Sequence, residues 1–300
     1  NLSFDTPIGI LDQPIVYDGK VLVSTTPSGY KPGSQGIIYA LDQQTGDVLW
    51  QFNTIQSPDL WGHPELNSGG GCWYPASIDV KTGNSFWGTG NPAPFAGTPE
   101  YPNGASRPGN NLYTNSILAL GSNGILQWYT QTIPHDLTDM DFQLTPILTT
   151  ANINGIDQDI AIGGGKWGRV FAFNRSTGAI LWVTPVGVHL NDNLVELPNE
   201  TIIVYPGYQG GIETPMACAD GVVYAGTNNL YAKWSPTTSF PPGGGLQPYD
   251  QGTCNLTAIQ VDTGKILWER NFTSEIFSGV TVINDLVFTA TYDGMIYALN

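Results

Sequence analysis

Short apolar segments joined by polar turns recur along this chain of 300 residues. In each copy an apolar segment leads into a polar turn that ends in Gly, and a second apolar segment places Trp four residues after that Gly. Because Gly adopts the positive φ of a tight turn without strain, each copy predicts a β-hairpin with an aromatic side chain buried at the same place. The four copies are YALDQQTGDVLW (39–50), LALGSNGILQW (118–128), FAFNRSTGAILW (171–182) and TAIQVDTGKILW (257–268).

A second pair of strand-like segments lies upstream of these hairpins, so each repeating unit has about four strands. Examples are IVYDGKVLVST (15–25), ASIDVKTGNSFWGTG (76–90), GVVYAGT (221–227) and VTVINDLVFTAT (280–291). Four-stranded repeats are typical of β-propeller blades, and a sandwich or a β-solenoid is the alternative. The pattern therefore predicts an all-β fold, a β-propeller whose four-stranded blades carry a Trp-containing repeat.

The repeat also predicts how the chain is divided. We expect a single β-propeller domain over residues 1–300 with about four to five blades. Gly/Pro-rich stretches at 91–111 and 234–252 are interpreted as loops, because the repeat resumes after each one. The chain stops where the last blade should begin its polar turn and Trp strand, which favours part of a larger propeller over a small one closed by exchanged end strands. The expected blades span approximately 14–53, 75–132, 145–187, 213–272 and, in part, 277–300.

Composition agrees with this pattern and excludes some functions. The 37 Gly and 22 Pro residues interrupt any helical periodicity. Ten Lys and Arg stand against 25 Asp and Glu, for a net charge of −15, which disfavours nucleic acid and anionic lipid as partners. No apolar run approaches the length of a membrane span. The first residue is Asn and few residues are Lys, so we expect a processed or excised chain, extracellular or periplasmic.

The three cysteines show no metal-ligand spacing. One disulfide is compatible with this number, and Cys218 with Cys254 is the pairing we favour, leaving Cys72 free.

Acidic residues gather in TIPHDLTDMDFQ (132–143), although the chain as a whole is sparsely charged. Asp139 and Asp141 would share one face of a strand, and two carboxylates so close repel each other unless a cation or a shared proton lies between them. This spacing indicates a metal site. The alternative is a turn whose Asp side chains cap backbone N–H groups. His135 is interpreted as structural, holding the loop by hydrogen bonds.

Three segments resemble the quinoprotein alcohol dehydrogenases, a family of eight-bladed propellers that hold pyrroloquinoline quinone (PQQ) on the central axis. They are GGGCWYPASIDVKTGNSFWGTGNPAPF (69–95), IPHDLTD (133–139) and GGGKWGRVFAFNRSTG (163–178). The resemblance covers roughly residues 14–300, and GTGNPAP together with PHDxxDxD is its specific part. It implies a fragment of an eight-bladed propeller, with PQQ and either Ca²⁺ or a lanthanide as cofactors.

The resemblance also implies roles for individual residues. Trp73 would stack on PQQ, since an indole offers a rigid plane, and Asn91 would give a neutral oxygen to the metal. Lys166 would contact the quinone oxygens and stabilise their charge during reduction. Glu213 is a further candidate for cofactor binding. The first three residues also have a purely structural interpretation, as a core indole, a turn Asn and a turn Lys.

The acidic pair receives the central role from the same resemblance. Asp139 would be the catalytic base that removes the alcohol proton. Asp141 would be a metal ligand, as in the lanthanide-type members of the family. One feature departs from the family: the stretch SGYKPGSQ (28–35), where the enzymes have a metal-ligating Glu, contains no acid and does contain Lys31. A cation there would disfavour a bound metal.

Two functions of different classes therefore compete. The first is a PQQ-dependent oxidoreductase that acts on an alcohol or sugar hydroxyl and passes electrons to a cytochrome c or a quinone. The second is a non-catalytic PQQ-like propeller that serves as an extracellular binding or scaffold module.

Overall fold

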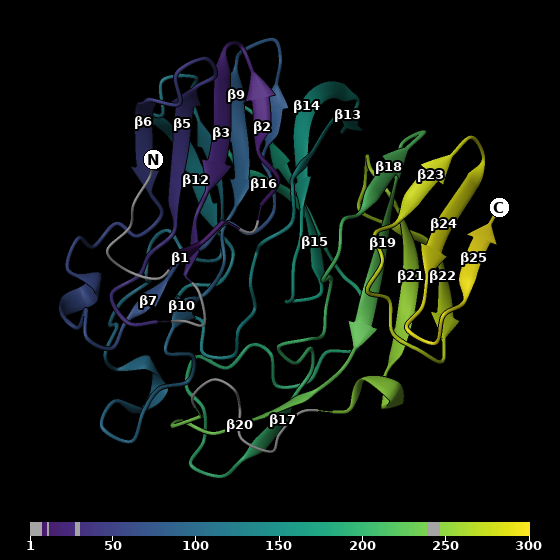
Figure 1. Cartoon of the computed structure of the whole chain (residues 1–300). Coiled ribbons are helices and arrows are strands. Elements are labelled where there is room, and N and C mark those ends of the chain that lie inside the picture. The colour runs from purple at the N-terminus through teal and green to yellow at the C-terminus, as the bar shows by residue number, and fades with distance from the viewer. Residues whose placement is uncertain (1–7, 11, 28–30, 239–246) are drawn as a thin grey trace. The chain divides into compact units, whose positions relative to one another are not determined.

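The computed structural model describes residues 8–10, 12–27, 31–238 and 247–300, and its regular structure is almost entirely β (Figure 1). Besides strands, the described residues form three single-turn 3₁₀ helices, Leu60–Gly62, Pro102–Gly104 and Tyr249–Gln251. The chain divides into two compact units. Unit 1 takes the described residues of Asn1–Thr145, Val195–Glu200 and Ser235–Gly243, and unit 2 takes those of Pro146–Leu194, Thr201–Trp234 and Gly244–Asn300.

Unit 1 contains two four-stranded antiparallel sheets, each ordered as an up-and-down meander. The first sheet consists of β2 (Ile15–Tyr17), β3 (Lys20–Ser24), β5 (Ile37–Asp42) and β6 (Val48–Asn53). The second consists of β8 (Ser77–Asp79), β9 (Asn84–Gly88), β11 (Ser116–Leu120) and β12 (Leu126–Gln131). Two short ribbons accompany them, β1 (Ile8–Gly9) with β4 (Thr26–Pro27) and β7 (Ser68–Gly69) with β10 (Pro92–Ala93).

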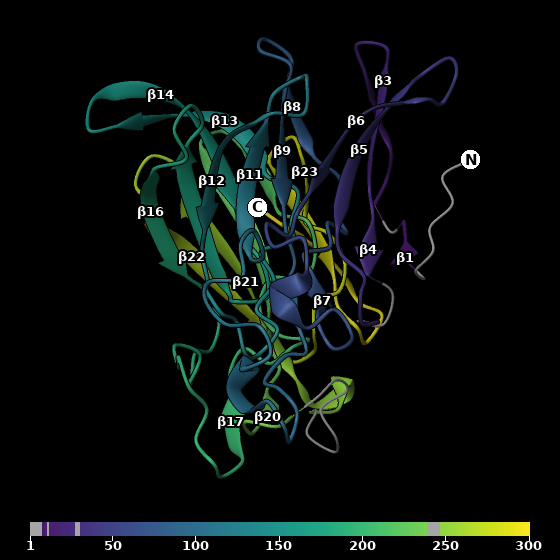
Figure 2. The ribbon, with the colours of Figure 1, turned by 90° about the vertical axis from the view of Figure 1, so that its left-hand side faces the viewer.

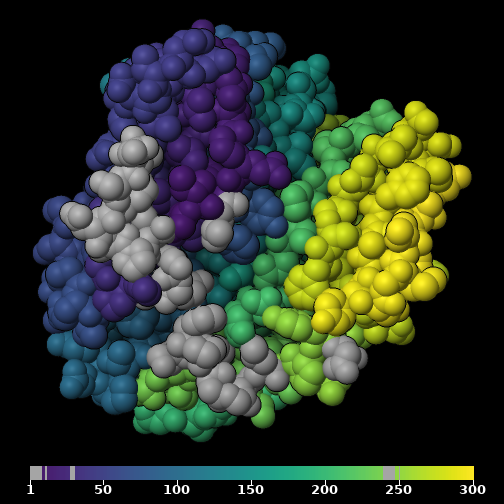
Figure 3. Space-filling model, viewed as in Figure 1, coloured from purple at the N-terminus to yellow at the C-terminus, as the bar shows by residue number. Residues whose placement is uncertain are grey.

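Unit 2 repeats the same meander. One sheet consists of β13 (Ile147–Ile153), β14 (Ile156–Gly163), β15 (Arg169–Asn174) and β16 (Ile180–Pro185). The next consists of β18 (Ala217–Ala219), β19 (Val222–Asn229), β21 (Thr253–Gln260) and β22 (Ile266–Phe272). The ribbon of β17 (Ile202–Val204) and β20 (Ala232–Trp234) extends beyond one end of β19 (Figure 1). In Figure 2 the same ribbon lies below β21. The last sheet has three strands, β23 (Thr281–Ile283), β24 (Leu286–Ala290) and β25 (Ile296–Leu299), and its surface is yellow in Figure 3.

The predicted four-stranded repeat is confirmed by these sheets, and their register explains the repeated Trp. In every four-stranded sheet the Trp of the outermost strand lies opposite an Ala of the neighbouring strand, and a register shift follows beside that pair. The pairs are Ala40–Trp50, Ala119–Trp128, Ala172–Trp182 and Ala258–Trp268. The small Ala leaves room for the indole, and the bulge turns the strand into the hairpin.

The Trp side chains are half-buried rather than buried, because they lie on the outermost strands. Within unit 1, Trp50 of the first sheet donates from Nε1 to the carbonyl of Ser122 in the hairpin turn of the second sheet, at 3.1 Å. A Cβ atom on Gly124 of that turn, whose φ is +79°, would lie 2.6 Å from the Trp50 ring. The turn Gly therefore serves two purposes, its positive φ and its contact with the Trp of the preceding sheet.

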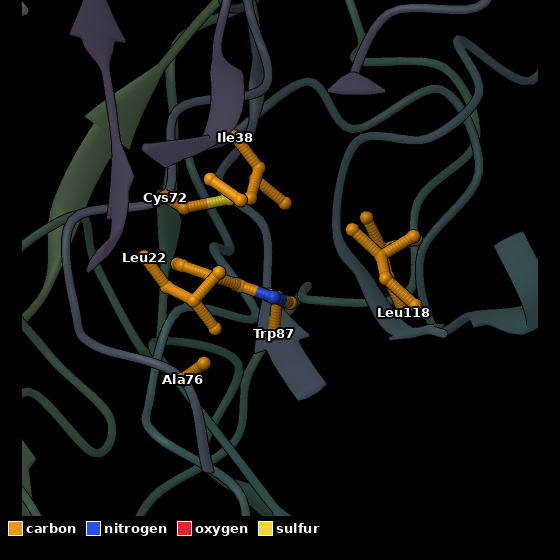
Figure 4. Close-up of a cluster of buried hydrophobic side chains, with 8 residues drawn as sticks. Leu22, Ile38, Cys72, Ala76, Trp87 and Leu118 are labelled. Carbon is orange, nitrogen blue, oxygen red and sulfur yellow. The ribbon is translucent and has the colours of Figure 1, made fainter. Parts of the chain in front are cut away.

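The two sheets of unit 1 enclose a hydrophobic core (Figure 4). Leu22 and Ile38 of the first sheet and Trp87 and Leu118 of the second are all buried there. Cys72 joins this cluster from the connection between the sheets, so the segment that precedes Trp73 is anchored in the core.

The predicted Cys218–Cys254 disulfide is wrong, since all three cysteines are free. Cys218 lies on β18 and Cys254 on β21, and both strands pair with β19, which runs between them. Strands two positions apart are about 10 Å from each other. A disulfide requires Cα atoms within about 7 Å.

Each sheet has two ends with different connections. In the second sheet Ser85 of β9 pairs with Leu120, near the β11–β12 hairpin, whereas Gly88 pairs with Ile117 at the opposite end. Long connections enter and leave at the Gly88 end. The β-hairpins lie at the other end, so the contact of Trp50 with the next sheet is separated along the strands from the long loops.

Candidate active site

All six candidate residues lie in connections at the long-loop end of their own sheets. Four belong to unit 1 and two to unit 2. In unit 1, Asn91 follows β9, while Trp73 precedes β8 and the acidic pair precedes β13. In unit 2, one residue lies in the β14–β15 turn and the other precedes β18. In chain order they are Trp73, Asn91, Asp139, Asp141, Lys166 and Glu213.

The glycine run 69–71 fixes the backbone on which the unit 1 residues stand. Gly70 donates its N–H to the carbonyl of Asn91 at 3.0 Å, and Gly90 donates to the carbonyl of Gly71 at 2.8 Å. A Cβ on Gly36 would lie 1.9 Å from the Gly70 oxygen, so this backbone is packed more closely than any side chain allows. The segment before Trp73 and the segment before Asn91 are thereby held side by side.

Trp73, Asn91 and Asp141 meet around Gly90. A Cβ placed on Gly90 would lie 2.9 Å from Asp141 Oδ1 and 3.4 Å from Trp73 Nε1. Asp141 Oδ1 also accepts the backbone N–H of Asn91 at 2.5 Å. Asn91 Nδ2 donates to the carbonyl of Pro92 at 2.8 Å, which fixes the amide so that Oδ1 faces away from that carbonyl. Thus the structure brings together three residues that are up to 68 positions apart in the sequence.

The prediction that Asp139 and Asp141 share one face of a strand is wrong, because no strand forms there. Both residues lie in an irregular loop that ends in a single bridge between Phe142 and Thr89. Asp139 has a φ of +66°, the left-handed conformation, which no β-strand contains. Both carboxyl groups are nevertheless buried, each residue being 1% exposed.

The remaining acid of the cluster is a loop cap, as the turn interpretation predicted. Asp136 accepts the backbone N–H of Thr138 at 2.9 Å and that of Met140 at 2.7 Å. The ring nitrogens of His135 lie 3.1 and 3.0 Å from the carbonyl oxygens of Gly109 and Asn103. These bonds agree with the structural role expected for His135.

Sequence reasoning missed Arg107, which lies fully buried beneath this loop. It donates to the carbonyl oxygens of Pro94, Phe95 and Asp136 and to Asn111 Oδ1. Burial lowers the pKa of Arg107 to about 10, and the charge of Asp136 opposes that shift. The available signal was weak: Arg107 is one of ten basic residues in the chain and lies in the Gly/Pro-rich stretch 91–111.

In unit 2, Lys166 and Glu213 lie on two segments whose backbones are hydrogen-bonded and closely packed against each other. Ile212 donates its N–H to the carbonyl of Gly165 at 3.1 Å, and a Cβ on Gly211 would lie 1.9 Å from the Lys166 oxygen. Lys166 is 4% exposed and Glu213 8% exposed, so neither is an ordinary surface residue. The charge of Glu213 contributes, after burial, to raising the pKa of Tyr249.

The stretch that departs from the family is described only in part, and Lys31 lies within the described part. Lys31 is exposed, and its charge is therefore screened by water. Residues 28–30 of this stretch lie outside the described residues. Gln35, at its end, forms a parallel bridge with Gly69 in the packed glycine run.

The oxygen-rich donor set of unit 1 suits a hard cation. Asn91 Oδ1 and the carboxylates of Asp139 and Asp141 are the ligand types that Ca²⁺ prefers. In the part of the chain that the structure describes, no group of three or more His, Cys, Asp or Glu side chains gathers as a metal site. A metal would therefore depend on Asn91, backbone carbonyls or the cofactor for its remaining ligands.

The family model for the β-propeller domain of glucose, ethanol and alcohol dehydrogenases, named PQQ, matches residues 5–187, well over half of the chain. The chain belongs to this PQQ β-propeller family. The match includes every candidate residue except Glu213. The PQQ β-propeller fold predicted from the sequence is thereby confirmed, whereas the eight-bladed ring and the individual residue roles remain predictions.

Relatives of this PQQ β-propeller are dehydrogenases of greater length. Quinoprotein alcohol dehydrogenase PedH of Pseudomonas putida is 25% identical over 96% of this chain and 56% of its own length. The structure of a quinohemoprotein alcohol dehydrogenase from Comamonas testosteroni matches with a TM-score of 0.82 at 21% identity, covering 97% of this chain and 51% of that one. A europium-containing methanol dehydrogenase matches with a TM-score of 0.77 at 22% identity, covering 95% and 58%.

The chain thus spans about half the length of these relatives. None of the described helices has the length and apolar character needed to cross a membrane.

Proposed function

We propose that this chain provides the base, the metal ligands and the stacking residue of a PQQ-dependent dehydrogenase that oxidises an alcohol or sugar hydroxyl. The observation that carries the proposal is the meeting of Trp73, Asn91 and Asp141 around Gly90, with Asp139 buried two residues before Asp141. A packed backbone without side chains at Gly70, Gly71 and Gly90 leaves these groups close together. Family membership supports the same assignment.

Each residue would perform one task. Asn91 and Asp141 would hold Ca²⁺ or a lanthanide, and Trp73 would hold the flat face of PQQ. When bound, PQQ supplies the hydride acceptor and the metal supplies a Lewis acid. Asp139 would accept the proton of the substrate hydroxyl, a task that suits a carboxylate held in a buried loop. Lys166 stays a prediction of the family resemblance, as a positive charge for the cofactor oxygens.

The electron acceptor and the location of the protein complete the proposal. The reduced cofactor must be reoxidised, and a cytochrome c or a quinone is the acceptor class that we propose. An extracellular or periplasmic location is consistent with the acidic, Lys-poor composition.

The test uses the full-length protein with PQQ and either Ca²⁺ or La³⁺. We expect the absorption spectrum of bound quinone and the dye-linked oxidation of a primary alcohol. Asp139→Asn should retain the spectrum but lose about 10² to 10⁴ of the rate, the contribution typical of general base catalysis. Asp157→Asn, at an exposed strand position, is the matched control and should behave like wild type. A protein that binds no PQQ contradicts the proposal.

The second candidate is a non-catalytic propeller that binds a partner or forms a scaffold. Two observations favour it: the described residues form no cluster of three metal-ligating acids, histidines or cysteines, and Lys31 occurs in the stretch where the family has Glu. The same experiment separates the two candidates, because the scaffold predicts that PQQ and metal change neither the spectrum nor the melting temperature.

A further inference from the structure

We propose that Asp136 is a positioning residue that holds Asp139 in its left-handed conformation by bonding the backbone on both sides of it. This inference rests on the proposed role of Asp139 as the base. Asp136 lies in the same acidic segment, and its side chain accepts the backbone N–H groups of the residues on either side of Asp139.

The two carboxylate oxygens of Asp136 are divided between the flanks of Asp139. Oδ1 accepts the N–H of Thr138, the residue before Asp139, at 2.9 Å. Oδ2 accepts the N–H of Met140, the residue after it, at 2.7 Å. Oδ2 also accepts Nδ2 of Asn115 at 2.9 Å, which fastens the loop to the end of the second sheet. The base is therefore held at both neighbours by one side chain.

Arg107 fixes the backbone of Asp136 in turn. Arg107 donates to its backbone carbonyl at 2.5 Å, and both residues are buried, at 0% and 3% exposed. An ordinary turn cap in the same chain differs: Asp42 accepts the N–H groups of Gln44 and Thr45 with one oxygen at an exposed turn. The double, buried bonding of Asp136 exceeds what a turn alone requires.

The conformation of Asp139 explains why such a support is needed. Its φ of +66° is uncommon for a residue with a side chain, and it persists only where the surroundings fix it. Without bonds to both flanking N–H groups the loop would relax towards ordinary φ values and carry the Asp139 carboxylate away. A displacement of the base by about 1 Å costs up to about a hundredfold in rate.

Asp136→Asn tests this directly. A carboxamide has one acceptor oxygen, so in either orientation its NH₂ group faces the N–H of Thr138 or of Met140 and that bond is lost. Asn115→Gly is the matched control, because it removes a hydrogen bond to the same carboxylate and leaves both flanking bonds intact. Gly is chosen there because Asn115 has a φ of +48°. Asp136→Ser, which buries no amide donor, replaces Asp136→Asn if that variant does not fold.

Two measurements are made on each variant. Hydrogen–deuterium exchange of peptides spanning 136–141 is followed in the cofactor-free protein, and kcat and KM for a primary alcohol are measured per mole of bound PQQ. We expect Asp136→Asn to speed exchange in this segment and to lower kcat by about 10- to 100-fold, with KM and the quinone spectrum unchanged. Asn115→Gly should lose stability without either effect.

Two results would overturn the inference. Unchanged exchange shows that Asp136 does not hold the loop, and faster exchange with full kcat per bound PQQ shows a structural role only. An inactive wild-type protein instead refutes the proposed function and the catalytic part of this inference together, while the exchange data still decide whether Asp136 fixes the loop.

Discussion

Replacing Gly124 by Ala measures the contact that joins the two sheets of unit 1. Gly46 and Gly124 occupy equivalent hairpin turns, with φ values of +76° and +79°. A Cβ on Gly46 would have no heavy atom within 4 Å, whereas a Cβ on Gly124 would lie 2.6 to 2.9 Å from three atoms of the Trp50 ring. The two substitutions therefore carry the same cost of placing Ala at a positive φ, and they differ only in the atoms that the new Cβ meets.

The magnitudes follow from that difference. Ala at a positive φ costs about 1 to 2 kcal/mol, and the reduced entropy of the unfolded chain returns roughly 0.4 to 1 kcal/mol of it. Gly46→Ala should thus lower the free energy of unfolding by about 1 kcal/mol. Gly124→Ala adds overpacking of roughly 1 to 3 kcal/mol, or the loss of the Trp50–Ser122 hydrogen bond if the indole moves away. We expect about 2 to 4 kcal/mol in total.

The assay is equilibrium urea unfolding followed by far-UV circular dichroism, because Trp fluorescence would change with the substitution itself. Each Gly→Ala change is also made in a Trp50→Ala background, where Gly124→Ala should cost no more than Gly46→Ala. Equal costs at the two glycines in the wild-type background would refute the reasoning. So would a difference that persists after Trp50 is removed.

Three further predictions concern buried groups. Burial raises the pKa of Asp12 above its ordinary value of 3.8. The stability that Asp12 contributes is therefore complete at acid pH and is lost as the pH rises through its pKa in the folded protein. Asp12→Asn should raise the melting temperature at pH 7 but not at pH 3. Burial raises the pKa of Cys254 to about 12, so iodoacetamide should label it in urea and spare it in the native protein, as peptide mass spectrometry would show. Gly36→Ala forces the new Cβ against Gly70, so it should lower the free energy of unfolding by about 3 kcal/mol or more and abolish PQQ binding. Gly279→Ala is the control, because its Cβ would have no atom nearer than 3.8 Å, and urea unfolding compares the two variants.

The regular part of the fold was predictable because its signals are local. A Gly at the turn and a Trp four residues later specify a hairpin whatever the rest of the chain does, and each hairpin occurs where the sequence placed it. The burial of Trp50 was overestimated, since the pattern marks an aromatic position without showing that it lies on an outermost strand. The Cys218–Cys254 pairing failed for a related reason, because spacing along the chain does not reveal that β19 runs between them.

The candidate site was predictable in its residue types and only partly in its geometry. Trp73, Asn91 and Asp141 come together because glycines with no side chain allow three backbones to pack closely, and those glycines are visible in the sequence. The left-handed conformation of Asp139 was not predictable, because Asp rarely adopts a positive φ and the segment 132–143 contains no Gly to mark one. Arg107 has no local signature, because its partners are mostly backbone carbonyls that any sequence provides.

The placement of hairpins and long connections at opposite ends of each sheet has a practical consequence. Trp50 contacts the hairpin turn of the next sheet at one end, while every residue proposed for the chemistry lies in a connection at the opposite end. Loops can therefore be exchanged between related blades without touching the Trp50 contact, provided that a graft between Gly88 and Ser116 keeps Tyr113, which packs against the core of the two sheets. New specificities can be sought in that way while the Trp50 contact and the core of the two sheets are both retained.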